Sequence, residues 1–287
     1  MKSDFYDAFV SIHRGLFNTR DRVDHARKRK IVSHIFSLKS VKEFEPYIRL
    51  HIGEFLRQWD KLAEGGKKGL SGKEGDGWFG RDGWVWFDCL PCESALSYLD
   101  FCGGGRCIDF ARCRFSGYNY LAFDVIGDLS FGSPFGMLQA AKDIAAVAKS
   151  QTNAMATYGK EEAEVDVEYF PAVRILNERG DYSASMGVLP PWVRPLLKKF
   201  HPWYRKGSVS TANLAGLAIA AVSKRLKTPT GRVDVLSKLQ AGKDDEGKPM
   251  GSPELTAEAL TQLIAGSDTT SKWEISHHLS LSFPRVY

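Results

Sequence analysis

One stretch of the sequence places a carboxylate, an alcohol and two very small residues within one helical pattern. Ala265 and Gly266 precede Asp268 and Thr269. Thr269 follows the two small residues by four and three positions, so all three are expected on one helix face. A hydroxyl beside a carboxylate can exchange protons with water or a ligand. The absence of bulk beside Thr269 predicts that a large flat ligand lies against this face, where a Gly-Thr sequence also permits local helix widening.

The element that must position these residues is a helix expected from Ser252 to Ser271. Ser252 can cap its first turn, Pro253 suits the first helical position, and Glu254 complements the positive end of the helix dipole. Helical spacing then predicts an apolar face, made of Leu255, Ala259, Leu260, Leu263 and Ile264.

The stretch Ala265 to Thr270, AGSDTT, resembles the oxygen-binding helix motif of the cytochrome P-450 monooxygenases. That resemblance implies a haem b cofactor. It also implies that Ala265 and Gly266 border the cofactor, that Gly266 makes room for dioxygen at the haem iron, and that Asp268 and Thr269 act as the catalytic proton relay. The alternative is a core helix with a chance polar step.

A second pair of residues matches the same family. Residues 24–36, DHARKRKIVSHIF, read as a basic helix on which His25 and Arg29 lie one turn apart. The family carries W-x-x-x-R here, and its two side chains bind a haem propionate. His25 replaces the Trp but can still donate a hydrogen bond to a carboxylate. The alternatives are a solvated charged face, or a nuclear localisation signal in residues 27–30, RKRK.

Composition restricts the class of protein. The chain has 287 residues, 43% hydrophobic and 25% charged, with a net charge of +5. These values are typical of a globular protein and do not favour nucleic-acid binding. No apolar run is long enough to span a membrane, and the N-terminus lacks a signal-peptide profile. The five cysteines lie between Cys89 and Cys113, and without a secretory signal a disulfide framework is not expected.

The segment 92–116 departs from the pattern on either side. It contains three consecutive glycines and four of the cysteines. Cys107 lies near the family's haem-ligand spacing but is out of frame, and it precedes the oxygen-binding helix instead of following it, so we reject it as the haem ligand. A zinc site around Cys89 and Cys92 fits no known spacing. We interpret the segment as a translated retained intron, because its codons can contain a splice donor.

The other segments provide structural expectations. We expect helices over 40–62, with a wholly core apolar face, and over 120–132, where Asp124 and Asp128 are more consistent with one capping and one solvated carboxylate than with an acid–base pair. We expect an Ala-rich helix over 139–158, a turn-rich stretch over 165–191, an apolar helix over 212–226 and a charged linker over 228–251. After Ser271 we expect no helical continuation.

Together these features predict a mainly α chain, the central helical part of a cytochrome P-450 fold without its N-terminal sheet or C-terminal haem-Cys region. The parts are 1–91, the inserted 92–116, 117–271 and a non-family tail 272–287. The sequences of residues 17–37 and 233–271 most resemble the fungal benzoate 4-monooxygenase branch. That resemblance implies a small aromatic acid substrate and electrons from an NADPH-dependent reductase.

That branch also implies an endoplasmic reticulum membrane location for full-length members, whereas this chain lacks the anchor and is expected to be soluble. Without the cysteine ligand it is expected to be inactive alone. The alternative is a non-enzymatic gene product that binds haem or a partner weakly.

Overall fold

A computed structural model describes residues 2–67, 106–160, 164–228 and 231–282, with side chains described for these except 59, 62–67, 106–116 and 272–282. Its elements run in the order η1 (Asp4–Phe9), α1 (Arg22–Ser33), η2 (His34–Phe36), α2 (Leu38–Lys67), α4 (Arg106–Phe131), α5 (Met137–Ala140), β1 (Ala145–Ala148), α6 (Gln151–Ala156), β2 (Val167–Phe170), α7 (Ala172–Val188), α8 (Arg194–Phe200), α9 (Pro202–Lys227), α10 (Val235–Ala241) and α11 (Ser252–Ser282). The mainly α class is confirmed.

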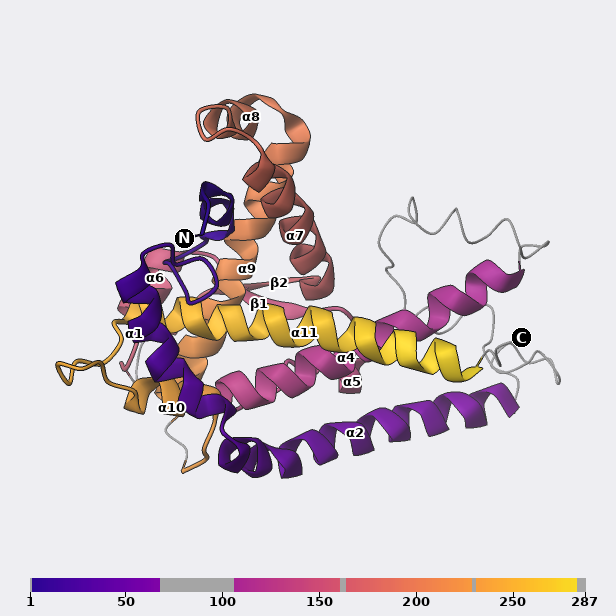
Figure 1. The fold of residues 1–287 in the computed structure, drawn as a ribbon. Helices are drawn as coiled ribbons and strands as arrows, with labels where there is room; N and C mark the ends of the chain where they lie inside the picture. Colours follow the sequence, from indigo (N-terminus) through magenta and orange to yellow (C-terminus); the bar gives the residue numbers. More distant parts are fainter. Residues whose placement is uncertain (1, 68–105, 161–163, 229–230, 283–287) are drawn as a thin grey trace.

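Three long helices form the body of the fold. In Figure 1, α11 and α4 lie side by side, and α2 runs along the other side of α4. The predicted apolar face of α11 is buried here, with Ala259 and Leu263 both fully inaccessible, and Phe123 of α4 is 1% exposed. The apolar periodicity of α11 therefore identified its packing face correctly.

The other helices form a second group around α9. Helix α7 packs along α9, and α8 lies at the far end of this pair from α11 (Figure 1). The antiparallel strands β1 and β2 also lie against α9, with Ala145 opposite Phe170 and Ala148 opposite Val167. A Cβ at Gly216 would lie 2.8 Å from Cγ1 of Val147, so a glycine is needed where α9 meets the sheet.

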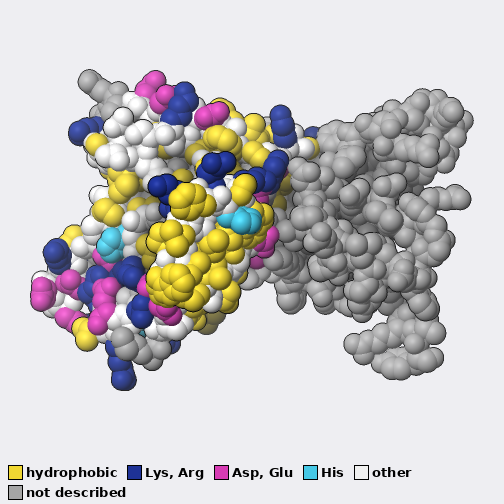
Figure 2. Space-filling view, turned by 90° about the horizontal axis from the view of Figure 1, so that it is seen from above, with side chains coloured by type: hydrophobic (Ala, Val, Ile, Leu, Met, Phe, Trp, Pro, Cys, Tyr) yellow, Lys and Arg dark blue, Asp and Glu magenta, His cyan; other side chains and the backbone are white. Residues whose placement is uncertain are grey.

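The α8 end exposes aromatic side chains. Trp192 is 74% exposed and Phe200 is 71% exposed. Viewed from that side, Figure 2 shows apolar side chains gathered on the surface with lysines and arginines among them. Within the described ranges, no helix combines the length and apolarity needed to cross a membrane.

Several expected elements are wrong. The helix expected over 139–158 is interrupted, since Ala141 adopts a left-handed conformation (φ 50°) and residues 145–148 form β1. The stretch 165–191 is mostly α7. The expected linker 228–251 contains α10, whose N-cap Asp234 forms a capping box with Ser237.

Two helix ends also differ from expectation. Helix α11 continues to Ser282, although residues 272–282 lack the apolar periodicity of the preceding turns. Helix α4 begins at Arg106, inside the segment interpreted as an insertion. Residues 92–105 of that segment lie outside the described residues, as do Cys89, Cys92 and Cys102.

The expectation that the apolar side of α2 is wholly core is also wrong. Phe44 and Phe55 are buried, whereas Val41, Ile52 and Leu56 are 48%, 42% and 56% exposed. Helix α2 packs against α4, α5 and η2, and these three side chains of its apolar stripe remain partly accessible to solvent.

Candidate functional site

The face of α11 that carries Ala265 and Thr269 is exposed. Both residues are accessible to solvent, while Leu263 and Ser267 beside them are buried. The Thr269 hydroxyl donates a 2.6 Å hydrogen bond to the carbonyl of Ala265 one turn earlier. The helix remains α through this turn, so the local widening that the Gly-Thr sequence permits is not present. Ala265 and Thr269 therefore present small side chains, a methyl group and a hydroxyl-bearing group, at the accessible side of this turn.

Gly266 does not share that open face, which corrects the expectation from spacing. A Cβ at Gly266 would lie 2.7 Å from Cδ1 and 2.8 Å from Cγ1 of Ile126. Successive helical residues are about 100° apart, and this step turns Gly266 toward α4. Its lack of a side chain permits close packing of α11 on α4. Asp268 is half-buried.

His25 and Arg29 lie one turn apart on α1, as predicted. His25 is half-buried and Arg29 is exposed. Within the described part of the chain, neither side chain has a hydrogen bond or ion pair. Burial lowers the pKa of His25, and the positive charges of Lys2 and Arg29 lower it further. A neutral imidazole beside a free guanidinium can still donate hydrogen bonds to a carboxylate.

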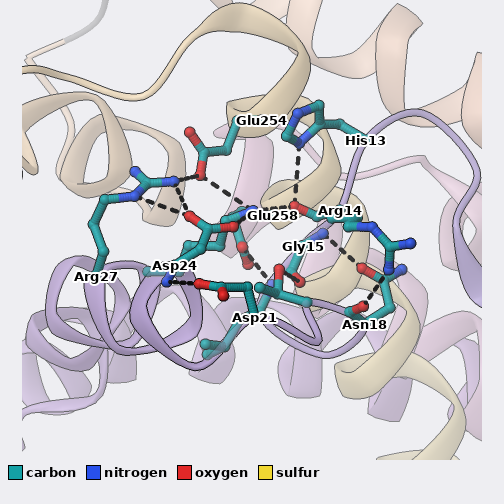
Figure 3. Close-up of polar contacts among 12 residues, drawn as sticks. His13, Arg14, Gly15, Asn18, Asp21, Asp24, Arg27, Glu254 and Glu258 are labelled. Carbon is teal, nitrogen blue, oxygen red and sulfur yellow. Dashed lines mark hydrogen bonds and ion pairs between the residues drawn. The ribbon is translucent and has the colours of Figure 1, made fainter. Parts of the chain in front are cut away.

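A polar cluster fixes α1 to the first turns of α11 (Figure 3). Arg27 bridges Asp24 at 2.6 Å and Glu254 at 2.5 Å. The Nζ of Lys28 lies 3.3 Å from Glu254 and donates to the carbonyl of Arg14. Because these contacts join the two helices, they also set where His25 and Arg29 lie relative to α11.

The four basic residues 27–30 therefore do not share one environment. Arg27 and Lys28 serve the contact between α1 and α11, and Lys28 is completely buried. Arg29 and Lys30 are exposed. A uniformly solvated charged face is wrong for this helix.

Sequence reasoning missed two buried charges in this cluster, Lys28 and Glu258. Glu258 is fully buried on α11, and its Oε1 accepts a hydrogen bond from the N–H of Leu16. The available signal was its position, since Glu258 lies among the apolar residues Leu255, Ala259 and Leu260. A charge inside an apolar run requires a specific partner.

Asp124 and Asp128 are both structural, and the expectation that one is solvated is wrong. Asp124 caps α5 by accepting from the N–H groups of Gly136, Met137 and Leu138. Asp128 is 6% exposed and accepts from His51 at 3.0 Å and Arg232 at 2.8 Å. The capping role predicted for one of them is confirmed.

Comparison with known proteins decides the family. The Cytochrome P-450 family model matches residues 115–273, more than half of the chain. The chain belongs to the cytochrome P-450 family. Among its relatives, benzoate 4-monooxygenase bphA of Aspergillus niger is 43% identical over 94% of this chain. Trichothecene C-15 hydroxylase of Fusarium sporotrichioides is 25% identical over 88% of it, and the cytochrome P-450 monooxygenase traB of Penicillium crustosum is 26% identical over 86%.

This cytochrome P-450 chain spans less than half the length of those relatives: 44% of bphA, 37% of the hydroxylase and 36% of traB. The family implies haem b as cofactor. The chemistry of the predicted residues fits such a group. Ala265 and Thr269 are small and accessible to solvent, and among the described residues the donors of His25 and Arg29 have no partners.

Proposed function

We propose that this chain is the central part of a haem-dependent monooxygenase that hydroxylates a small aromatic acid at the para position. The observation that carries the proposal is the accessible face of Ala265 and Thr269 in a chain 43% identical to a benzoate 4-monooxygenase. Haem b, when bound, supplies the iron at which dioxygen is activated, and an NADPH-dependent reductase is the proposed electron donor.

The chain's own residues have three proposed roles. Ala265 leaves space next to the cofactor, and Thr269 holds a proton at its Oγ1, which it can redirect from the Ala265 carbonyl toward a ligand. Asp268, half-buried at the position before Thr269, exchanges that proton with water. His25 and Arg29 bind the propionates by charge-assisted hydrogen bonds. Gly266 supports this arrangement by holding α11 close to Ile126.

The test is a chimera of Aspergillus niger bphA in which the aligned segment is replaced by residues 1–91 and 117–271 of this chain. The proposal expects haem uptake, the thiolate-type carbon monoxide difference spectrum and conversion of benzoate to 4-hydroxybenzoate. Thr269→Ala should lower product formed per NADPH consumed without reducing haem content, because it removes a proton donor only. A chimera that folds but takes up no haem, or unchanged coupling in Thr269→Ala, would contradict the proposal.

The chain on its own is proposed to be inactive, and residues 92–116 are proposed to be retained intron. Incubation of the purified chain with haem and reductase tests the first statement, and product formation would refute it. Sequencing of transcripts tests the intron proposal, which requires a messenger RNA that joins the codon of residue 91 to the codon of residue 117. The alternative of a non-enzymatic product requires that neither the chain nor the chimera forms 4-hydroxybenzoate.

A further inference from the structure

Arg179 is a buried cation without a counter-ion. Arg179 is 6% exposed and lies on the side of α7 that packs against η1. One terminal nitrogen donates a 2.9 Å hydrogen bond to the carbonyl of Phe9, and the guanidinium lies 5.3 Å from the centre of the Phe9 ring. The Nε is buried and has no partner. Within the described ranges, no carboxylate lies within ion-pair distance of Arg179.

Other buried cations of this protein are neutralised. Arg225 donates from Nε to Asp234 at 2.6 Å, and Lys28 lies 3.3 Å from Glu254. A buried charge without such a partner is strongly destabilising. Burial lowers the pKa of Arg179 to about 10, so the group stays positive at neutral pH. The fold retains a charge that its described residues leave uncompensated, which indicates an anionic ligand.

Two hydroxyls in the same region also lack partners. Ser183 follows Arg179 by one turn of α7, so both lie on one helix face. Ser183 is completely buried, and its Oγ has no hydrogen-bond partner. The Oγ of Ser11, two residues after Phe9, is likewise buried and unpartnered. A carboxylate accepts several hydrogen bonds, and a guanidinium can bind it in a bidentate manner.

Aromatic side chains border the same charge. The Phe9 ring lies 5.2 Å from that of Phe5 and 5.5 Å from that of Phe17, measured between ring centres. Aromatic rings pack favourably at such separations in tilted and edge-on arrangements. The ligand suited to this surrounding therefore combines a carboxylate with an aromatic ring.

We propose that Arg179 binds the carboxylate of an aromatic monocarboxylic acid, with Ser183 as a second donor, and thereby determines the substrate class of the site. This inference rests on the proposed function. The para carbon is the ring atom farthest from the carboxylate, so anchoring the carboxylate at Arg179 keeps the para carbon as far from the guanidinium as the ring allows.

The test compares two probes of nearly equal shape, benzoate and the neutral benzamide, by isothermal titration calorimetry with the whole chain. We expect the wild type to bind benzoate at least tenfold more tightly than benzamide. Arg179→Gln should remove that preference and leave benzamide affinity within twofold. Arg174→Gln is the matched control, because Arg174 is on the same helix but 56% exposed and paired with Glu178. Equal binding of the two probes by the wild type, or a retained preference in Arg179→Gln, overturns the proposal.

Arg179→Met separates ligand binding from a purely structural role. The Phe9 carbonyl would remain satisfied, since Nδ2 of Asn18 also donates to it at 3.1 Å. The melting temperature without ligand should be equal to or above that of the wild type, and benzoate should no longer raise it. A lower melting temperature with benzoate protection intact overturns the proposal. Neither measurement requires haem, so the two proposals can fail separately. A chimera that takes up no haem would contradict the proposed function, whereas the selectivity of the chain for benzoate over benzamide would still support the role of Arg179.

Discussion

Glu258 on α11 accepts a 2.5 Å hydrogen bond from the backbone N–H of Leu16, 242 positions earlier in the chain. The other carboxylate oxygen of Glu258 is buried without a partner. Burial raises the pKa of Glu258 to about 7, although the Leu16 N–H and the charge of Lys28 oppose it. The bond fixes the segment before α1 to the helix that carries Thr269. Because Glu258 is buried, the folded state is most stable when this carboxyl group is protonated.

Replacing Glu258 with Gln should therefore stabilise the protein at alkaline pH. The unfolded carboxyl loses its proton near its ordinary pKa of 4.5 and the folded one near 7, so between these values the unfolded state binds fewer protons. The stabilising contribution of the protonated form is complete below pH 4.5 and is lost as pH rises through about 7. The difference amounts to about 3 kcal/mol. Urea unfolding should give a gap between Glu258→Gln and wild type that widens toward pH 8.

The control for that experiment is Glu246→Gln, since Glu246 is exposed in the loop after α10. Its free energy of unfolding should follow the wild-type pH dependence. If Glu258→Gln also follows it, the buried carboxylate does not titrate as stated.

Replacing Lys28 with Met should weaken the contact between α1 and α11. Lys28 is fully buried, donates to the Arg14 carbonyl and lies 3.3 Å from Glu254. Removing this buried donor should cost about 3 kcal/mol, because Arg14 loses the donor to its carbonyl and Glu254 keeps only its pair with Arg27. Lys30→Met is matched, because the Lys30–Asp245 pair is 61% and 79% exposed and should cost below about 1 kcal/mol. Equal losses in chemical denaturation would show that burial of Lys28 contributes nothing.

The sequence was informative where structure depends on local signals. The Ser252–Pro253 start and apolar spacing of α11 predicted the helix and its buried face, and the Thr269 hydroxyl lies on the accessible side. Strand β1 was missed because AAVA favours a helix on its own, and only its pairing with Val167–Phe170 makes it a strand. Gly266 was assigned to the wrong face, because which side of α11 meets Ile126 depends on the packing of α4. The burial of Lys28 and Arg179 likewise depends on distant segments.

Replacing Asp128 with Asn should destabilise the junction of α2, α4 and the segment before α10. Burial acts to raise the pKa of Asp128, but the hydrogen bonds from His51 and Arg232 outweigh it and lower the pKa. The carboxylate's contribution is present above its unfolded pKa of 3.8 and is lost as pH falls through the lower folded value. The loss should be about 3 kcal/mol at pH 7 and should shrink in acid.

Asp166→Asn is the control for Asp128→Asn, since the Lys149–Asp166 pair is largely exposed. Acid titration of far-ultraviolet circular dichroism checks both variants. A gap between Asp128→Asn and wild type that persists unchanged below pH 3 would contradict the assigned ion pairs.

Two glycine-to-alanine changes should have opposite signs although both lie inside helices. At Gly266 a new methyl group would meet the Ile126 side chain at 2.7 Å, and overpacking costs about 1–3 kcal/mol, partly offset by the better helix propensity of Ala. At Gly180 of α7 no atom lies within 4 Å of the added Cβ, so Ala should stabilise by about 0.5–1 kcal/mol.

The close contact at Gly266 can be separated from propensity by a double mutant. In an Ile126→Ala background the nearest remaining atom is Cβ of residue 126, at 3.4 Å, so Gly266→Ala should lose its penalty there and become neutral or stabilising. Thermal unfolding of the two single variants and the double mutant measures the coupling between the sites. Additive effects would mean that Ile126 yields to the added methyl group, and Gly266 would then not be needed for the packing of α11 on α4.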